Sequence, residues 1–199
     1  FEQNVDIILD IATSLLYRII DTYKGIISIG VTGQMHGIVY IDAEGNAVSN
    51  LVNWQDKRAD QPLDNGKTTC QMIFDITGEK ISTGYGIATH YCNMLCGEVP
   101  KNATGICSIM DLFCMKICET NKVATHTSVA SSFGLFDIEK GEFKYGGTTG
   151  SNLLHKEGSV ALWRTWTAGD NSYSTNGSVK TGRGTWMMPT SSYSNYDDW

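Results

Sequence analysis

The sequence predicts a domain that combines helices with a β-sheet, of the α/β or α+β class, and three observations lead to this prediction. Isoleucines and leucines recur at helical spacing over residues 7–20. Short runs of β-branched residues follow at 26–31 and 38–41. Residues 132–143 alternate in polarity around a turn, which is typical of a hairpin. Because helices and strands are interleaved along the chain, we expect a mixed sheet with flanking helices.

The first helix is expected to begin at Asn4, whose side chain can accept a backbone hydrogen bond from the first turn. Asp6 follows where the positive end of the helix dipole favours a carboxylate, and Gly25 marks the expected stop. The apolar residues fall three or four positions apart and predict one broad face: Ile7, Ile8, Ile11, Leu15, Leu16, Ile19 and Ile20.

Three strands are expected next. The runs at residues 26–31 and 38–41 are interrupted by a glycine-bounded loop at 32–37, and a turn at 42–46 leads to a returning strand over residues 47–53. Consecutive strands with short connections usually pair. We therefore expect these three strands to be neighbours in one sheet, with the first helix packed on one face.

The remainder of the chain divides into two parts. Helices are expected over residues 88–96 and 107–119. After about residue 146, Gly, Ser, Thr, Asn and aromatic residues replace the aliphatic ones, which suits either a low-complexity tail or a small β module. We therefore assign residues 1–145 to one domain and leave residues 146–199 as an unassigned tail. With few aliphatic side chains, the tail is expected to pack weakly.

Composition excludes several classes of function. The 15 Lys and Arg against 21 Asp and Glu give a net charge of −6, and no dense basic run indicates a nucleic-acid partner. No apolar stretch approaches the ~20 residues that span a bilayer, and no export signal is visible at the start. These features predict a cytoplasmic protein without a membrane partner.

The six cysteines are interpreted as reduced, partly buried thiols rather than as metal ligands. Cys92 and Cys96 are four positions apart, as are Cys114 and Cys118, but no CxxC pair occurs. Structural zinc sites usually contain such a close pair. We therefore expect no metal site.

The loop around His36 is the first candidate site. A strand leading into a glycine-bounded loop lets backbone and side chains such as Gln34, Met35 and His36 approach a ligand closely. The alternative is a surface histidine or one whose hydrogen bonds are satisfied within the fold. Neither GxxxxGK[ST] nor GxGxxG occurs, so the glycines do not form a known phosphate loop.

The second candidate site comprises Trp54, Asp56 and Arg58. An aromatic face beside a carboxylate and a guanidinium suits a sugar, because a sugar offers C–H faces for stacking and hydroxyls for hydrogen bonds. The alternative is a tryptophan packed in the core beside a solvated ion pair. The residue types alone favour neither interpretation.

Taken together, the segments resemble the FGGY family of carbohydrate kinases. Within that family the chain looks most like the sedoheptulokinase branch and next like the xylulokinase branch, and the resemblance covers residues 1 to about 145. The landmarks occur in the expected order: Glu2-Gln3-Asn4, residues 29–37 with the core Gly33-Gln34-Met35-His36-Gly37, Asp42-Ala43-Glu44-Gly45, Trp54-Gln55-Asp56-Lys57-Arg58, residues 83–89 and residues 130–137.

The resemblance implies an actin-like, ribonuclease-H-like fold whose two domains close over ATP and a sugar. It implies transfer of a phosphoryl group from ATP, with Mg²⁺, to a ketose such as sedoheptulose. The loop holding Gln34, Met35 and His36 would contact the sugar, the stretch from Trp54 through Asp56 to Arg58 would lie close by, and the loop at residues 84–89 would border the pocket.

The chain also departs from the family pattern. The family's Asp-x-Gly-Thr phosphate hairpin is absent from these 199 residues, and so is its catalytic aspartate in a Gly-Asp motif. Gly169-Asp170 is a superficial match without family context. We therefore expect an incomplete sugar-side domain that holds no catalytic residue, binds ATP and Mg²⁺ weakly, and is inactive alone. The alternative is a non-catalytic carbohydrate-binding module.

Overall fold

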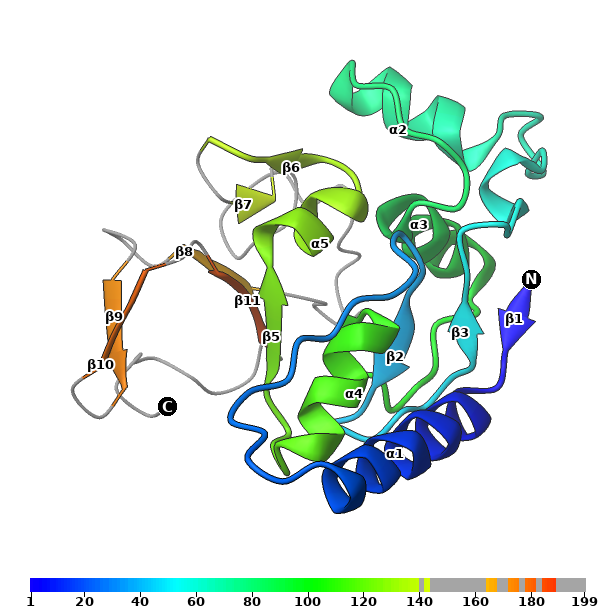
Figure 1. Ribbon diagram of the computed structural model, residues 1–199. Coiled ribbons are helices and arrows are strands. Elements are labelled where there is room, and N and C mark those ends of the chain that lie inside the picture. The colour runs from blue at the N-terminus through cyan, green and yellow to red at the C-terminus, as the bar shows by residue number, and fades with distance from the viewer. Residues whose placement is uncertain (140–141, 144–163, 168–171, 176–177, 182–183, 189–199) are drawn as a thin grey trace.

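The computed structural model describes residues 1–139, 142–143, 164–167, 172–175, 178–181 and 184–188 (Figure 1). For residue 142 and for the last four ranges, only the backbone is described. The described part contains helices and short strands interleaved along the chain, so the predicted α/β class is confirmed. None of its helices is long and apolar enough to cross a membrane.

Helix α1 (Val5–Thr22) follows a short strand, β1 (Glu2–Gln3). Asn4 caps it as predicted, because the Asn4 side chain accepts a hydrogen bond from the backbone N–H of Ile7 at 3.0 Å. The helix packs beside α4 (Ile109–Ile117), as Figure 1 shows. Among its residues only Val5 and Leu9 are buried, so the broad apolar face predicted for this helix faces solvent over much of its length.

The strands that hold the site form short antiparallel ladders. Strand β2 (Val39–Ile41) pairs with β4 (Gly105–Cys107), and β3 (Leu51–Val52) pairs with β1. Bridges from Ile38 to Val52 and from Ile41 to Ala47 place β2 beside the segment that returns to β3. The predicted adjacency of residues 38–41 with the returning strand is therefore found. Every ladder within the described ranges is antiparallel, so the parallel pairing that a mixed sheet requires is not found there.

The strand predicted for residues 26–31 is wrong. These residues have no regular secondary structure, and Ile27 is 97% exposed. A β-branched run becomes a strand only where another backbone pairs with it. One side of β2 is taken by β4 and the other by the segment leading to β3. Within the described residues, no strand edge is paired with this run.

The helices that surround the site are bounded by local signals. Helix α2 (Thr69–Thr77) and α4 each begin with a capping box, and α2 ends at Gly78 in the left-handed conformation. The helix predicted over residues 88–96 starts two residues earlier, as α3 (Gly86–Cys96). The helix predicted over residues 107–119 is shorter, because Cys107 belongs to β4 and Ser108 is the helix cap. The remaining elements here are η1 (Arg58–Asp60), β5 (Val123–His126), α5 (Thr127–Ser132), and the predicted hairpin as β6 (Phe136–Asp137) and β7 (Glu142–Phe143).

Four strands lie within residues 146–199, the segment that we left as an unassigned tail. Strands are what the small β module, one of the two alternatives for this segment, would contain. Strands β9 (Ser172–Thr175) and β10 (Ser178–Thr181) pair with each other, and β11 (Gly184–Met188) lies between β8 (Arg164–Thr167) and β5. Figure 1 shows β9 and β10 away from α1 to α4. The pairing with β5 joins the tail backbone to the first part of the chain. The side-chain packing predicted to be weak lies outside the described residues, and the boundary at residue 145 stays a prediction.

The apolar core lies between β2, β3 and β4 and the helices α3 and α4. It also includes the residues just after α5, where Phe133 is fully buried. This core fixes the ends of β2 and β3, and the candidate site is built on those ends. Its largest fully buried apolar side chains are Tyr40, Phe133, Ile38, Ile41, Leu51, Ile73, Ile87, Ile106, Val39 and Val123.

Candidate functional site

Four segments meet where the chain enters β2, and we call this place the loop junction: residues 34–37, 53–56, 83–86 and 132–134. Two glycines show how closely the segments approach. A Cβ on Gly84, whose φ is +84°, would lie 2.0 Å from the carbonyl oxygen of Trp54. A Cβ on Gly86 would lie 2.7 Å from the Phe133 ring. Only glycine fits at such distances, so Gly84 and Gly86 allow these segments to pack closely against one another.

His36 lies at the centre of the loop junction. Its backbone is left-handed, with φ +73°, a conformation uncommon outside glycine. Two contacts with Ser132 hold it there. The His36 N–H donates to the Ser132 hydroxyl at 3.2 Å, and His36 Nδ1 lies 2.6 Å from the Ser132 carbonyl oxygen. The imidazole also stacks on Tyr85, with ring centroids 4.5 Å apart and planes 4° from parallel.

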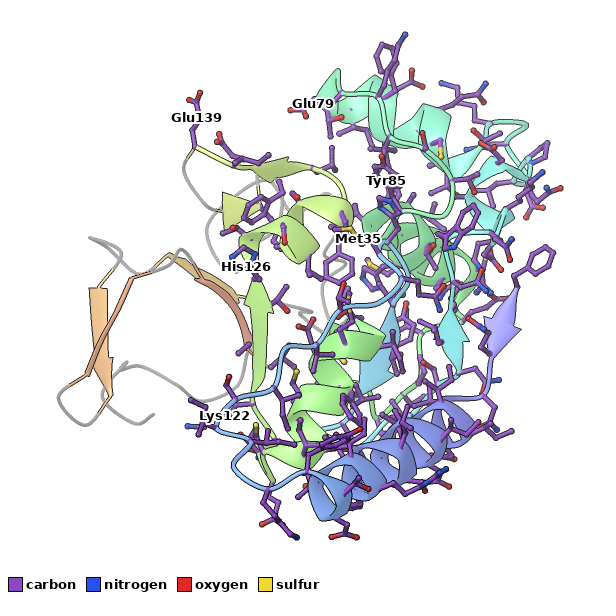
Figure 2. All side chains as sticks on the ribbon, viewed as in Figure 1. Met35, Glu79, Tyr85, Lys122, His126 and Glu139 are labelled. Atoms are coloured by element: carbon purple, nitrogen blue, oxygen red, sulfur yellow. The ribbon has the colours of Figure 1, made fainter. Side chains whose placement is uncertain are left out.

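The two residues before His36 differ in their freedom to meet a ligand. Met35 is exposed, and Figure 2 shows it with Tyr85 in the region between α3 and α5. The Gln34 amide nitrogen donates to Gln3 Oε1 at 2.8 Å, and the same oxygen accepts from Asn53 at 3.2 Å. Gln34 therefore ties its loop to β1 and to the residue that precedes Trp54.

Trp54 is 53% exposed beside Tyr85's loop, so it is not the core tryptophan of the alternative interpretation. Asp56, by contrast, is buried and fully engaged. Its carboxylate accepts from Arg58 Nε at 2.8 Å, from the Arg58 backbone N–H at 2.9 Å and from the Phe1 amino group at 2.5 Å. Burial alone would raise the pKa of Asp56, but these donors outweigh it and lower the pKa to about 2.

Arg58 joins this ion pair to a chain of buried polar groups. Its guanidinium donates to Asn93 Oδ1 at 2.7 Å, Asn93 donates to the Tyr40 hydroxyl at 3.1 Å, and that hydroxyl lies 2.9 Å from His90 Nδ1. Burial raises the pKa of Tyr40 far above its usual range, although the hydrogen bond from Asn93 opposes the rise. Because Asp56 and Arg58 are committed to these partners, they hold the Trp54 segment in place, and Trp54 itself stays free for a ligand.

The structure therefore separates the six predicted site residues into two groups. Met35, His36 and Trp54 lie at the loop junction with exposed or half-buried side chains, while Gln34, Asp56 and Arg58 bind mainly to other protein groups. Sequence reasoning missed the contributions of Ser132 and Asn93, and it treated Tyr85 only as part of the bordering loop. The sequence signal for Tyr85 was its position between two glycines.

The described residues offer little for a nucleotide or a metal ion. In the glycine-rich turn at residues 83–86, the Trp54 carbonyl fills the place that a Cβ at Gly84 would take, so this side of the turn packs against protein. Within the described ranges, no three His, Cys, Asp or Glu side chains are grouped to hold a metal ion. The six cysteines are free thiols, and burial raises the pKa of Cys70 to about 11, which leaves that thiol protonated near neutral pH. We assign none of the described residues to ATP or Mg²⁺.

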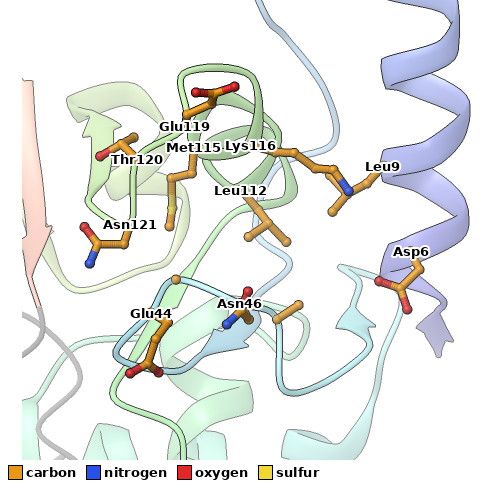
Figure 3. Close-up of a pocket in the computed structure, with 12 residues that line it drawn as sticks. Asp6, Leu9, Glu44, Asn46, Leu112, Met115, Lys116, Glu119, Thr120 and Asn121 are labelled. Atoms are coloured by element: carbon orange, nitrogen blue, oxygen red, sulfur yellow. The ribbon is translucent and has the colours of Figure 1, made fainter.

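A separate pocket of about 620 Å³ lies between α1, α4 and the turn after β2 (Figure 3). It is lined by the carboxylates of Asp6, Glu44 and Glu119 and by one cation, Lys116. None of the predicted site residues lines it. Its excess of carboxylates disfavours phosphate groups, and the loop junction remains the candidate site.

Comparisons with known proteins agree on one family. The model of the N-terminal domain of the FGGY family of carbohydrate kinases matches residues 1–147. Xylulose kinase from Staphylococcus xylosus is 39% identical over 66 residues, which make up 32% of this chain and 14% of that protein. The chain therefore spans a small part of the relative it matches.

Two solved structures share the fold. Gluconate kinase from Lactobacillus acidophilus has a TM-score of 0.59 and 20% identity, covering 72% of this chain and 30% of that one. Ligand-bound xylulose kinase from the same organism has a TM-score of 0.56 and 21% identity, covering 68% of this chain and 28% of that one. At these identities the likeness shows the fold, which in these kinases is the actin-like ATPase fold.

Proposed function

The chain belongs to the FGGY family of carbohydrate kinases, and from this premise we propose that it is the sugar-contacting part of an ATP-dependent ketose kinase. The family places it among kinases that act on small carbohydrates. The observation that carries the proposal is that the loop junction brings the stacked rings of His36 and Tyr85 together with the exposed side chain of Trp54. Flat aromatic faces beside hydrogen-bonding groups are the means by which proteins recognise sugars.

In this proposal the residues of the chain bind and orient the sugar. Trp54 and Met35 offer apolar surface to the C–H faces, and His36 offers a ring nitrogen to a hydroxyl. Asp56 and Arg58 hold the Trp54 segment through their ion pair. When bound, ATP supplies the phosphoryl group and Mg²⁺ offsets its charge. The chain's own contribution is to position the hydroxyl that accepts the phosphoryl group.

The proposed substrate is a ketose, with sedoheptulose and xylulose as the two sugars to compare. The sequence landmarks favour the sedoheptulokinase branch, whereas the matched curated relative is a xylulose kinase. Titration calorimetry of the 199-residue chain with both ketoses tests the proposal. We expect one of the two ketoses to bind with a millimolar or lower dissociation constant. Failure of every ketose to bind would overturn it.

A matched pair of variants tests the site. We expect His36→Asn to weaken ketose binding by about ten- to a hundredfold, since one polar contact contributes ~1–3 kcal/mol. Asparagine tolerates the left-handed backbone at this position, so the loop is retained. His126→Asn is the control, because His126 caps the end of α5 opposite to Ser132 and asparagine also caps helices. Equal affinities for both variants would remove His36 from the site.

The chain alone is expected to show no ketose-dependent turnover of ATP. Phosphoryl transfer needs bound nucleotide, a positioned hydroxyl and a base near that hydroxyl. Only the hydroxyl's position is attributed to this chain. A coupled assay of ADP release, run with and without ketose, checks this. Turnover that depends on ketose would contradict the assignment of the chain as the sugar-contacting part.

A further inference from the structure

The His36 ring is oriented by two residues from distant segments, Ser132 and Tyr85. Its Nδ1 lies 2.6 Å from the carbonyl oxygen of Ser132, a residue 96 positions away. A carbonyl oxygen can only accept a hydrogen bond. The proton of the neutral imidazole therefore resides on Nδ1, and Nε2 carries a lone pair.

The Nε2 atom of the half-buried His36 ring is not engaged by the described part of the protein. Among the described residues no protein group is hydrogen-bonded to it, and it is not one of the buried polar atoms without a partner. Nε2 is therefore accessible to solvent at the loop junction. A nitrogen lone pair held there accepts a hydrogen bond from a hydroxyl and repels the oxygen of a carbonyl or ether.

Tyr85 holds the plane of the ring. The His36 and Tyr85 rings are stacked 4° from parallel at 4.5 Å between centroids. The position of Tyr85 is itself fixed, because the glycines on both sides lie against the Trp54 carbonyl and the Phe133 ring. The stack keeps Nδ1 directed at the Ser132 carbonyl, and Nε2 is left without a protein partner among the described residues.

We propose that Tyr85 and Ser132 are positioning residues that hold His36 as its Nδ1–H tautomer, so that Nε2 selects a sugar hydroxyl over a carbonyl, an ether or a deoxy carbon. The selection rests on the proposed ketose function. The tautomer rests on geometry alone. The two parts therefore have separate tests.

The first test is spectroscopic and needs no sugar. Two-bond ¹H–¹⁵N correlation spectra of the full chain with ¹⁵N-labelled histidine report which ring nitrogen carries the proton. We expect His36 to show the Nδ1–H pattern, the opposite of the form that free histidine prefers in water. In Tyr85→Leu we expect a mixture of tautomers, and in Tyr85→Phe the original pattern, since phenylalanine retains the stack. An Nε2–H pattern in the unmodified chain would overturn the positioning role.

The second test measures hydroxyl selection. Affinities for the ketose that binds best are compared with those for its singly deoxygenated analogues. We expect one analogue to lose at least tenfold in the unmodified chain and to lose much less in His36→Asn. Tyr85→Leu is expected to weaken ketose binding about three- to tenfold, the worth of a stacked aromatic pair, and Tyr85→Phe to restore it.

Tyr17→Leu is the control for loss of a tyrosine, because Tyr17 is 62% exposed on α1. Equal losses in Tyr17→Leu and Tyr85→Leu would overturn the positioning role. Uniform affinity across the deoxy analogues would overturn hydroxyl selection. An Nδ1–H pattern without any ketose binding would instead refute the proposed function and hydroxyl selection together, leaving the tautomer as a fact of the fold.

Discussion

The polar cluster around Arg58 and the apolar face of α1 are opposites in how far they are satisfied. In the cluster, Asp56 is 5% exposed and its carboxylate has several donors, while Arg58 links two strand-end segments to α3. On α1, large apolar side chains face solvent, with Ile11 at 66% and Leu15 at 53% exposure. The charged groups found partners and the apolar groups did not.

The difference shows what each kind of group requires. A buried carboxylate needs only a few donors at fixed positions, and Arg58 is two residues from Asp56. A helix face needs an extended surface of complementary shape. The α1 residues that find such a surface and are buried are Val5 and Leu9, both in the first half of the helix. Substitutions in the small polar cluster should therefore change the stability of the fold strongly, whereas substitutions over most of the long helix should change it little.

The largest expected effect follows from breaking the cluster. Arg58→Met leaves the buried Asp56 carboxylate and the Asn93 oxygen short of donors, and we expect the free energy of unfolding to fall by about 3 kcal/mol. Urea denaturation followed by circular dichroism measures it. Lys67→Met is the matched control, because its pair with Asp75 is exposed and should contribute less than ~1 kcal/mol. Similar losses in both variants would contradict the distinction between the two regions.

A pair of truncations on α1 sharpens the comparison. Leu9 is 6% exposed and Ile11 is 66% exposed on the same helix. Leu9→Ala should lower the free energy of unfolding by about 2–3 kcal/mol, and Ile11→Ala by less than ~0.5 kcal/mol. The same urea titration checks both. A large loss at Ile11 would mean that its side chain is covered in solution.

The smallest effect is a dependence of stability on pH. The folded-state pKa of Asp56 is lowered to about 2 from 3.8, so its carboxylate stabilises the fold above pH 3.8 and loses that contribution as the pH falls toward 2. We expect unmodified chain and Asp56→Asn to differ in unfolding free energy at pH 5, and this difference to shrink by on the order of 1 kcal/mol by pH 2.

The unfolding free energies of the two chains are subtracted because Asp111 makes stability depend on pH in the opposite direction. Burial raises the pKa of Asp111 despite hydrogen bonds from Thr125 and Ser108, so its protonated form is favoured in the folded state. Its contribution is present at low pH and is lost as the pH rises. Asp111 is present in both chains and cancels. A difference that stays constant from pH 5 to pH 2 would refute the role given to the Asp56 carboxylate.

Much of the local structure could be predicted from the sequence. The cap of α1 at Asn4 and the hairpin of β6 and β7 depend on residues a few positions apart. The glycine-bounded loop before β2 and the family landmarks within residues 1–147 are likewise patterns of residues that are close in the sequence. Such signals are readable because each is satisfied by its near neighbours in the chain.

The candidate site could be predicted only in part. Its glycines, Met35, His36 and Trp54 were identified from residue type and spacing. The sequence did not reveal that Asp56 and Arg58 bind each other and that Arg58 also binds Asn93, because Asn93 is 35 residues from Arg58. The strand predicted at residues 26–31 failed for a similar reason, since a β-branched run is a strand only beside a partner.

The sequence by itself determined the capped start of α1, which loops can bend sharply and which family the chain resembles, because these depend on short-range chemistry. The tertiary structure alone decided which face of α1 is buried, that Tyr85 stacks on His36, and that the Ser132 carbonyl lies against Nδ1 of the His36 ring. These contacts join residues up to 96 positions apart. They depend on how the core packs β2 against α3 and the end of α5, and that packing is a property of the whole fold.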